Sequence, residues 1–167
     1  MKSDVTEGLD PDMYGQVHPH ETPELLLRKL QEFDRILRQR TSHETEDNLG
    51  LLRALHKCHE LFTASFKIRF MRSVVFNVDE AVKMVERYWN KRIELFGIKA
   101  FSEMTQDSLF TEDEYALHLG YLRIHPDALD ERGRAVIFLD PSLHDSRQYS
   151  RESMCRVIFY MLDTAFR

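Results

Sequence analysis

The segment Ala135-Val136-Ile137-Phe138-Leu139 decides the fold class, because it is an unbroken apolar run with β-branched and aromatic members. A run of this length is short for a helix and favours a strand that is buried on both faces. Tyr121-Leu122-Arg123-Ile124 is a second strand candidate, which we expect Pro126 to end. Residues 130–133, between the two candidates, have the composition of a turn.

A strand buried on both faces needs neighbouring strands, and two strands alone make a marginal sheet. No segment after residue 139 offers a third or fourth strand, and the sequence contains no internal repeat that would replace one. We therefore expect either that the strand prediction is wrong or that these residues belong to a larger fold.

Helical patterns flank the two strand candidates. Thr22-Pro23-Glu24 combines an N-cap hydroxyl, a proline at the first helical position and a first-turn acid. The apolar face that follows consists of Leu26, Leu30, Phe33 and Leu37. Further helical patterns cover residues 51–62 and 66–71. After a polar loop at residues 141–149, Ser150 begins a last helix. Its apolar face consists of Met154, Val157, Ile158, Met161, Leu162 and Ala165.

The strongest helical pattern begins at Asn77, where Asn77 and Glu80 have the spacing of a capping box. Its apolar face consists of Val78, Ala81, Val82, Val85, Trp89 and Ile93. Gly97 stands where a helix C-terminal glycine belongs. Thr111 and Glu114 repeat the cap spacing, and Gly120 offers a second stop. Residues 1–21 have glycines and prolines but no apolar period, and we expect a flexible tail there.

Composition narrows the class of protein further. The 167 residues include 23 Lys and Arg against 28 Asp and Glu, and the net charge of −5 argues against a dedicated nucleic-acid binder. The sequence has no apolar run near the roughly 18 residues of a membrane span, and residues 1–12 lack the apolar core of a signal peptide. Cys58 and Cys155 are therefore predicted to be free thiols in the reducing cytoplasm or nucleus.

Residues 68–81 read Ile68-Arg69-Phe70-Met71-Arg72-Ser73-Val74-Val75-Phe76-Asn77-Val78-Asp79-Glu80-Ala81. They are similar to a pattern of the CRAL-TRIO lipid-binding family, Leu-Leu-Arg-Phe-Leu-Arg-Ala-Arg followed by Lys-Phe-Asp-Val-Asp. Further segments resemble those of this family in the same order. Residues 88–92 resemble the family's Tyr-x-x-Trp-Arg helix end, and 133–138 its Gly-Arg-Pro-Val strand. Residues 140–149 resemble its Trp/His-Asp-Pro loop. The chain departs at Ser73-Val74 and at Ala135, where the family has Ala-Arg and Pro.

The resemblance implies an α+β or α/β fold in two parts after the tail. Residues 22–97 would be the N-terminal helical module, a small bundle. Residues 98–167 would be the beginning of the lipid-binding domain, with the first strands and a helix of an incomplete α/β sandwich. The family domain is longer, and the part that the resemblance does not cover supplies the remaining strands and a mobile gate helix.

The resemblance also places part of a lipid cavity wall on the strand at 135–139 and on the last helix. The positions carried over are Ile137, Leu139, Cys155, Ile158, Phe159 and Leu162. A lipid tail needs a dry, apolar lining of this kind. The alternative is that these side chains pack as ordinary core, with Cys155 an inert buried thiol.

Lys83, Arg87 and Lys91 recur every four residues and are candidates for contact with anionic lipid headgroups. The alternative for these three residues is a solvated helix face, since Glu86 and Glu94 dilute the charge. We predict no metal site, because His56 and His59 have no matching second pair of ligands. No nucleophile, phosphate-loop or dinucleotide-binding motif is present, so we expect neither enzymatic activity nor a cofactor.

The function expected from the resemblance is non-catalytic binding of a small hydrophobic lipid of the phosphoinositide, tocopherol or retinoid class, and its transfer between membranes. Its partners would be the lipid ligand and, transiently, a membrane surface, and nucleic acid is not expected among them. Its location would be cytoplasmic and peripheral to membranes. The alternative function is a helical protein–protein interaction module without a lipid cavity, whose open strand edge dimerises or aggregates.

Overall fold

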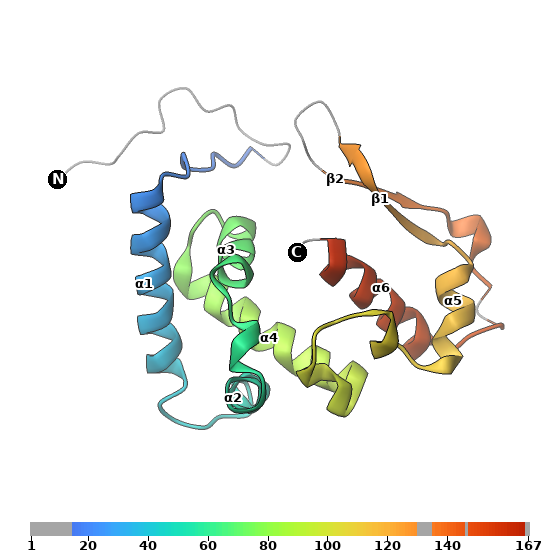
Figure 1. Ribbon diagram of the computed structural model, residues 1–167, viewed down its shortest axis with the longest axis horizontal. Coiled ribbons are helices and arrows are strands. Elements are labelled where there is room, and N and C mark those ends of the chain that lie inside the picture. Colours follow the sequence, from blue (N-terminus) through green and yellow to red (C-terminus); the bar gives the residue numbers. More distant parts are fainter. Residues whose placement is uncertain (1–14, 130–134, 146, 166–167) are drawn as a thin grey trace. The chain divides into compact units, whose positions relative to one another are not determined.

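The computed structural model describes residues 15–129, 135–145 and 147–165. In these ranges the chain forms six α-helices and one two-stranded antiparallel sheet, which is an α+β fold (Figure 1). The chain divides into two compact units, Met1–Asn90 and Lys91–Arg167. The division falls inside the helix Val78–Phe96, seven residues before the boundary expected after Gly97. The predicted tail at residues 1–21 lies mostly outside the described residues.

The first unit consists of α1 (Pro23–Arg40), α2 (Leu49–Lys57), α3 (Ala64–Ser73) and most of α4 (Val78–Phe96). Two of the predicted caps are confirmed, because the Thr22 hydroxyl accepts from the N–H of Leu25 at 3.2 Å and Asn77 Oδ1 accepts from the N–H of Glu80 at 3.3 Å. The cap predicted at Thr111 is wrong, because Thr111 lies inside the 3₁₀ turn Thr111–Asp113 and Asp113 precedes the next helix. The predicted apolar segments supply Phe33, Leu51, Met71, Val82, Val85 and Trp89 to the core, which also includes Ala54 and Cys58.

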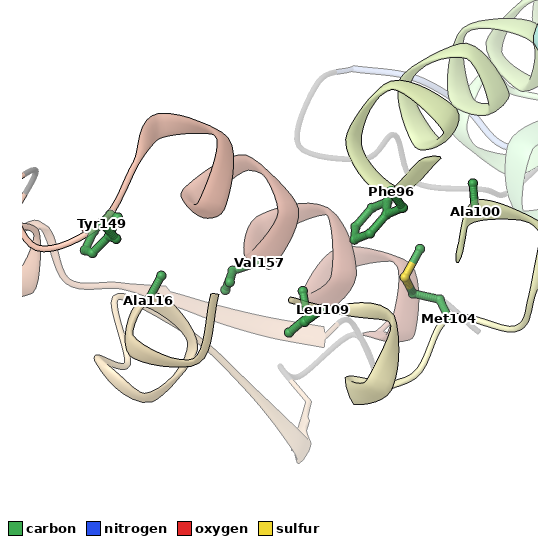
Figure 2. Packing of buried hydrophobic residues seen from close by; sticks show 7 residues of the cluster. All are labelled: Phe96, Ala100, Met104, Leu109, Ala116, Tyr149 and Val157. Carbon is green, nitrogen blue, oxygen red and sulfur yellow. The ribbon is translucent and has the colours of Figure 1, made fainter. Parts of the chain in front are cut away.

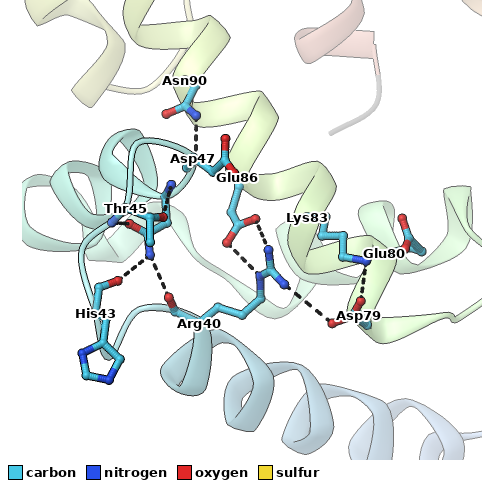
Figure 3. A network of polar contacts seen from close by, with 10 residues as sticks. Arg40, His43, Thr45, Asp47, Asp79, Glu80, Lys83, Glu86 and Asn90 are labelled. Carbon is cyan, nitrogen blue, oxygen red and sulfur yellow. Dashed lines mark hydrogen bonds and ion pairs between the residues drawn. The ribbon is translucent and has the colours of Figure 1, made fainter.

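A polar network holds the loop between α1 and α2 against α4 (Figure 3). The Arg40 guanidinium donates to both carboxylate oxygens of the buried Glu86, at 2.9 and 2.8 Å. Asn90 on α4 donates to the backbone carbonyl of Asp47 and accepts from the N–H of Gly50 at 3.0 Å. These charge-assisted and amide contacts fix where α2 begins.

The turn between α3 and α4 has two residues in the left-handed region, Val75 at φ 51° and Phe76 at φ 58°. This conformation is uncommon for any residue with a Cβ and is costly for a β-branched one. The N–H of Phe76 donates to the carbonyl of Met71 at 2.7 Å, and the Phe76 side chain is buried. Burial of Phe76 and closure of the α3 C-terminus therefore offset the strain at Val75.

The second unit continues from the end of α4 through short 3₁₀ turns to α5 (Glu114–His118), β1 (Leu122–Leu129), β2 (Ala135–Leu139) and α6 (Arg151–Ala165). Gly97 has φ 55° and Gly120 has φ 69°, as expected for helix C-terminal glycines. The core of the second unit includes Val157 of α6 and residues from the end of α4, from the turn Gly97–Phe101, from α5 and from connecting segments (Figure 2). The other members of this core are Phe96, Ala100, Met104, Leu109, Ala116 and Tyr149.

The two predicted strands pair antiparallel, with Leu122 opposite Leu139, Arg123 opposite Phe138 and Ile124 opposite Ile137. The prediction that Pro126 ends β1 is wrong, because β1 runs to Leu129. The register is irregular between Ile124 and Leu129, since proline has no N–H to donate to a ladder.

The prediction that β2 is buried on both faces is also wrong. Ile137, Phe138 and Leu139 are 38, 58 and 54% exposed, although they alternate between the two faces of the sheet. The physical reason is that β2 belongs to a sheet of two strands within the described part of the chain, which is too narrow to hold β2 at the centre of a covered sheet.

In residues 15–129, 135–145 and 147–165, no helix is both long enough and apolar enough to cross a bilayer. Neither cysteine is in a disulfide, as predicted. Cys58 is buried, whereas Cys155 is exposed, which corrects the expectation that Cys155 is a packed thiol.

We predict that Gly50→Ala destabilises the first unit by about 1–3 kcal/mol, the usual cost of overpacking. A Cβ at residue 50 would collide with the Asn90 side-chain oxygen and would lie 3.1 Å from the Asn90 Cα. The decrease in the free energy of unfolding is measured by urea unfolding, with circular dichroism as the signal. Ser65→Ala, at an exposed position of α3, is the control that should change stability little. Equal stability of Gly50→Ala and the control would contradict the tight contact.

Candidate functional site

The inner side of α6 is fixed by a buried ion pair. Arg156 donates from Nε and Nη2 to both carboxylate oxygens of Asp113, at 2.7 to 3.0 Å, and also reaches Glu112. The Asp113 side chain is fully buried, and it accepts from the N–H of Phe110 at 2.9 Å. Because an unpaired charge at this depth would be costly, the pair orients α6 around its long axis.

The environment of Asp113 also sets its protonation. Burial acts to raise the pKa of Asp113, but the hydrogen bonds from Arg156 and from the Phe110 N–H outweigh it, so the pKa lies below its ordinary value. Two cations lie over the Phe110 ring, with the Lys99 ammonium 4.5 Å and the Arg156 guanidinium 4.9 Å from its centroid. Phe110 therefore contributes to holding the ion pair in place.

Three of the predicted lipid-contact residues share one face of α6. Cys155, Ile158 and Leu162 are spaced by three and four residues, which places them on one helical stripe. That stripe lies opposite the one that buries Ser153, Arg156 and Val157. Cys155 is exposed, and Ile158 and Leu162 are half-buried. The Arg156–Asp113 pair thus directs these apolar side chains away from the core of the second unit.

Phe159, a fourth predicted lipid contact, lies elsewhere on α6. Its ring packs edge-to-face on Phe96 with the centroids 5.6 Å apart, and it is partly buried against the core cluster. For Phe159, the contact with Phe96 agrees with the alternative that we left open, namely ordinary core packing.

The two predicted lipid contacts on β2 are Ile137 and Leu139. Their cross-strand partners are Ile124 and Leu122, so all four side chains lie on one face of the hairpin. Leu122 is buried, whereas Leu139 is more than half exposed. On this face of the hairpin, the Leu122 side chain of β1 is therefore covered, whereas the Leu139 side chain of β2 is open to solvent.

An aromatic cluster at the start of α6 was not foreseen from the sequence. The Tyr149 hydroxyl is hydrogen-bonded to Nδ1 of His144, and the His144 ring also lies 5.7 Å from Tyr121. Burial raises the pKa of Tyr149 above its ordinary value. The sequence signal was the density of aromatic residues on both sides of the hairpin, but their proximity depends on the strand pairing.

The basic residues on α4 are largely neutralised by acids on the same helix. Lys83 Nζ lies 2.7 Å from carboxylate oxygens of both Asp79 and Glu80, and Lys91 lies 2.7 Å from Glu94. Arg87 is exposed. These pairs agree with the alternative that the basic residues form a solvated helix face.

Metal ligands do not gather around the candidate histidines. His56 and His59 are exposed, and the His59 ring lies 3.6 Å from Glu60. Across the described ranges, no three side chains of His, Cys, Asp or Glu are placed to hold a metal ion.

Comparison with known proteins does not extend these assignments, because no family model, curated protein or solved structure matches the chain. The candidate site therefore rests on the residues themselves: Ile137 and Leu139 on β2, and Cys155, Ile158 and Leu162 on α6.

We predict that Asp113→Asn lowers the free energy of unfolding at neutral pH by about 3 kcal/mol, because it leaves the Arg156 guanidinium buried without its main carboxylate. The lowered pKa of Asp113 means that its contribution is present above the unfolded-state pKa and is lost as the pH falls through the folded-state value.

The gap in stability between wild type and Asp113→Asn should therefore narrow in acid, as measured by urea unfolding at several pH values. Asp107→Asn, at an exposed position, is the control and should follow wild type throughout. If the difference in free energy of unfolding between wild type and Asp113→Asn stayed constant down to the lowest pH measured, the Asp113 carboxylate would not be the group that stabilises the fold.

Proposed function

We propose that this chain takes part in non-catalytic binding and intermembrane transfer of a small hydrophobic lipid, of the phosphoinositide, tocopherol or retinoid class, as a member of the CRAL-TRIO type. The observation that carries the proposal is the open apolar face of β2. It lies in the segment that resembles the family's Gly-Arg-Pro-Val strand, between the other resembling segments in their family order.

The physical work of such a protein is desolvation. Ile137 and Leu139 are 38 and 54% exposed, and each would contribute about 1 kcal/mol if a lipid tail covered it. Cys155, Ile158 and Leu162 offer further apolar surface on α6. No bond is made or broken, so the chain needs no nucleophile, metal or cofactor for this activity.

Loading and unloading would take place at a membrane surface in the cytoplasm. Lys83, Arg87 and Lys91 are the candidates for transient contact with anionic headgroups. Arg87 is the strongest of the three candidates, because Lys83 and Lys91 have acidic partners on α4. Membrane contact in this proposal is peripheral.

The alternative is a helical protein–protein interaction module without a lipid cavity. The observation that favours the alternative is the outer edge of β2, which pairs with no strand among the residues that the structure describes and is a template for another strand. The two functions differ in one measurable outcome, because lipid transfer requires a bound lipid and the interaction module does not.

Lipid transfer by the full 167-residue chain is tested between donor and acceptor vesicles. Fluorescent phosphatidylinositol, tocopherol and retinaldehyde serve as cargo, and mass spectrometry identifies any lipid that co-purifies. We predict that Leu139→Asp lowers the transfer rate about tenfold, because it removes apolar contact and places a charge against the lipid tail.

Leu27→Asp is the matched control, since Leu27 on α1 is 60% exposed and Leu139 is 54% exposed. It should transfer lipid at the wild-type rate. A wild-type chain that neither co-purifies with lipid nor accelerates transfer would overturn the proposal and favour the interaction module.

A further inference from the structure

The outer edge of β2 has the features of a strand-pairing surface, and the hydrogen-bond pattern of the hairpin shows which groups it offers. The N–H of Asp140 donates to the carbonyl of Tyr121 at 2.8 Å, so these two residues form a hydrogen-bonded pair. Such pairs alternate along an antiparallel ladder. Arg123 and Phe138 are therefore the next hydrogen-bonded pair, and the N–H and C=O groups of Ile137 and Leu139 point away from β1.

The two strands differ in how their outer edges are protected. Natural sheets protect an open edge with charged residues, proline or irregular register. β1 has Arg123, Pro126 and the register irregularity between Ile124 and Leu129. From Ala135 to Leu139, β2 has neither charge nor proline, and its side chains at 137, 138 and 139 are exposed.

The chemistry of this edge selects a strand as its occupant. A lipid tail on a face of the hairpin covers side chains but offers no hydrogen-bond partner to the outward N–H and C=O groups of Ile137 and Leu139 at the edge. A strand offers both a donor and an acceptor to these groups. β1 of another copy fits poorly, because Pro126 lacks an N–H.

We propose that β2 pairs antiparallel with β2 of a second copy of this chain, about a two-fold axis through Ile137, to form a four-stranded sheet. In this register Ile137 faces Ile137 of the second copy, and residues 135 and 139 face each other, so the outward groups of each copy meet those of the other.

Charge also selects this arrangement. Parallel pairing in register would set the two Asp140 carboxylates side by side, whereas the antiparallel arrangement places them at opposite ends of the new ladder. Each Asp140 keeps Arg123 of its own copy within 4.0 Å. Pairing through the backbone edge leaves the faces of the sheet in place, so the proposal does not rest on lipid binding.

The test uses the two-fold axis, because residue 137 of each copy meets its own counterpart with the Cβ atoms about 5 Å apart. The wild-type chain should show a concentration-dependent monomer–dimer equilibrium in sedimentation velocity. Ile137→Lys and Ile137→Glu should each raise the dissociation constant at least about tenfold through like-charge repulsion. An equimolar mixture of the two variants should recover a heterodimer.

Leu27→Lys, on the exposed face of α1, is the control and should dimerise as wild type does. Amide hydrogen exchange keeps the test independent of folding. The N–H groups of residues 137 and 139 should be protected in the wild-type dimer and should exchange rapidly in Ile137→Lys. The N–H of Phe138, which is directed at β1, should stay protected in both proteins.

A wild-type chain that is monomeric at every concentration would overturn the proposal. So would a dimer that Ile137→Lys leaves intact, or a mixture of the Lys and Glu variants that remains monomeric.

Discussion

Among the described residues, the backbone N–H and C=O groups of β2 have strand partners on one edge only, the edge next to β1. Both activities proposed for the second unit depend on this constraint. A five-residue apolar strand is suited to the centre of a sheet, where neighbours cover both of its edges and helices cover its faces. Here β1 is the one neighbour within the described residues, and Ile137, Phe138 and Leu139 remain exposed. Both proposed activities use this incomplete burial, one through the side chains and the other through the backbone edge.

The buried ion pair gives the same unit a fixed orientation. Arg156 and Asp113 join α6 to the 3₁₀ turn at Thr111–Asp113, and the Val157 cluster packs beside them. Ion pairs of this kind contribute little net stability compared with a well-packed apolar core, but an alternative rotation of α6 would leave a charge unpaired. The stripe of Cys155, Ile158 and Leu162 owes its outward direction to this restriction.

The helices show how much local sequence predicts. The caps at Thr22 and Asn77, the apolar face on α4 and the stop at Gly97 were predicted from spacing, and the structure confirms them. These features are local, because a cap or an amphipathic stripe depends on residues within one or two turns of each other. The strand pairing was also predicted, from composition and from the turn residues between the two strands. The site residues are different, since the sequence named Ile137, Leu139, Cys155, Ile158, Phe159 and Leu162 through a resemblance, and their lipid contacts stay predictions.

Periodicity and composition were sufficient to establish that helices precede and follow a short apolar hairpin along the chain and that neither cysteine forms a disulfide. They were not sufficient to establish which apolar residues are covered. Phe159 is packed and Cys155 is exposed, although both belong to the same helix, because the depth of a side chain depends on what other elements bring against it. The exposure of β2 has the same origin. Its amino acids are those of a buried strand, and its surroundings in the folded chain leave it open, since burial arises from contacts between segments that are distant in sequence.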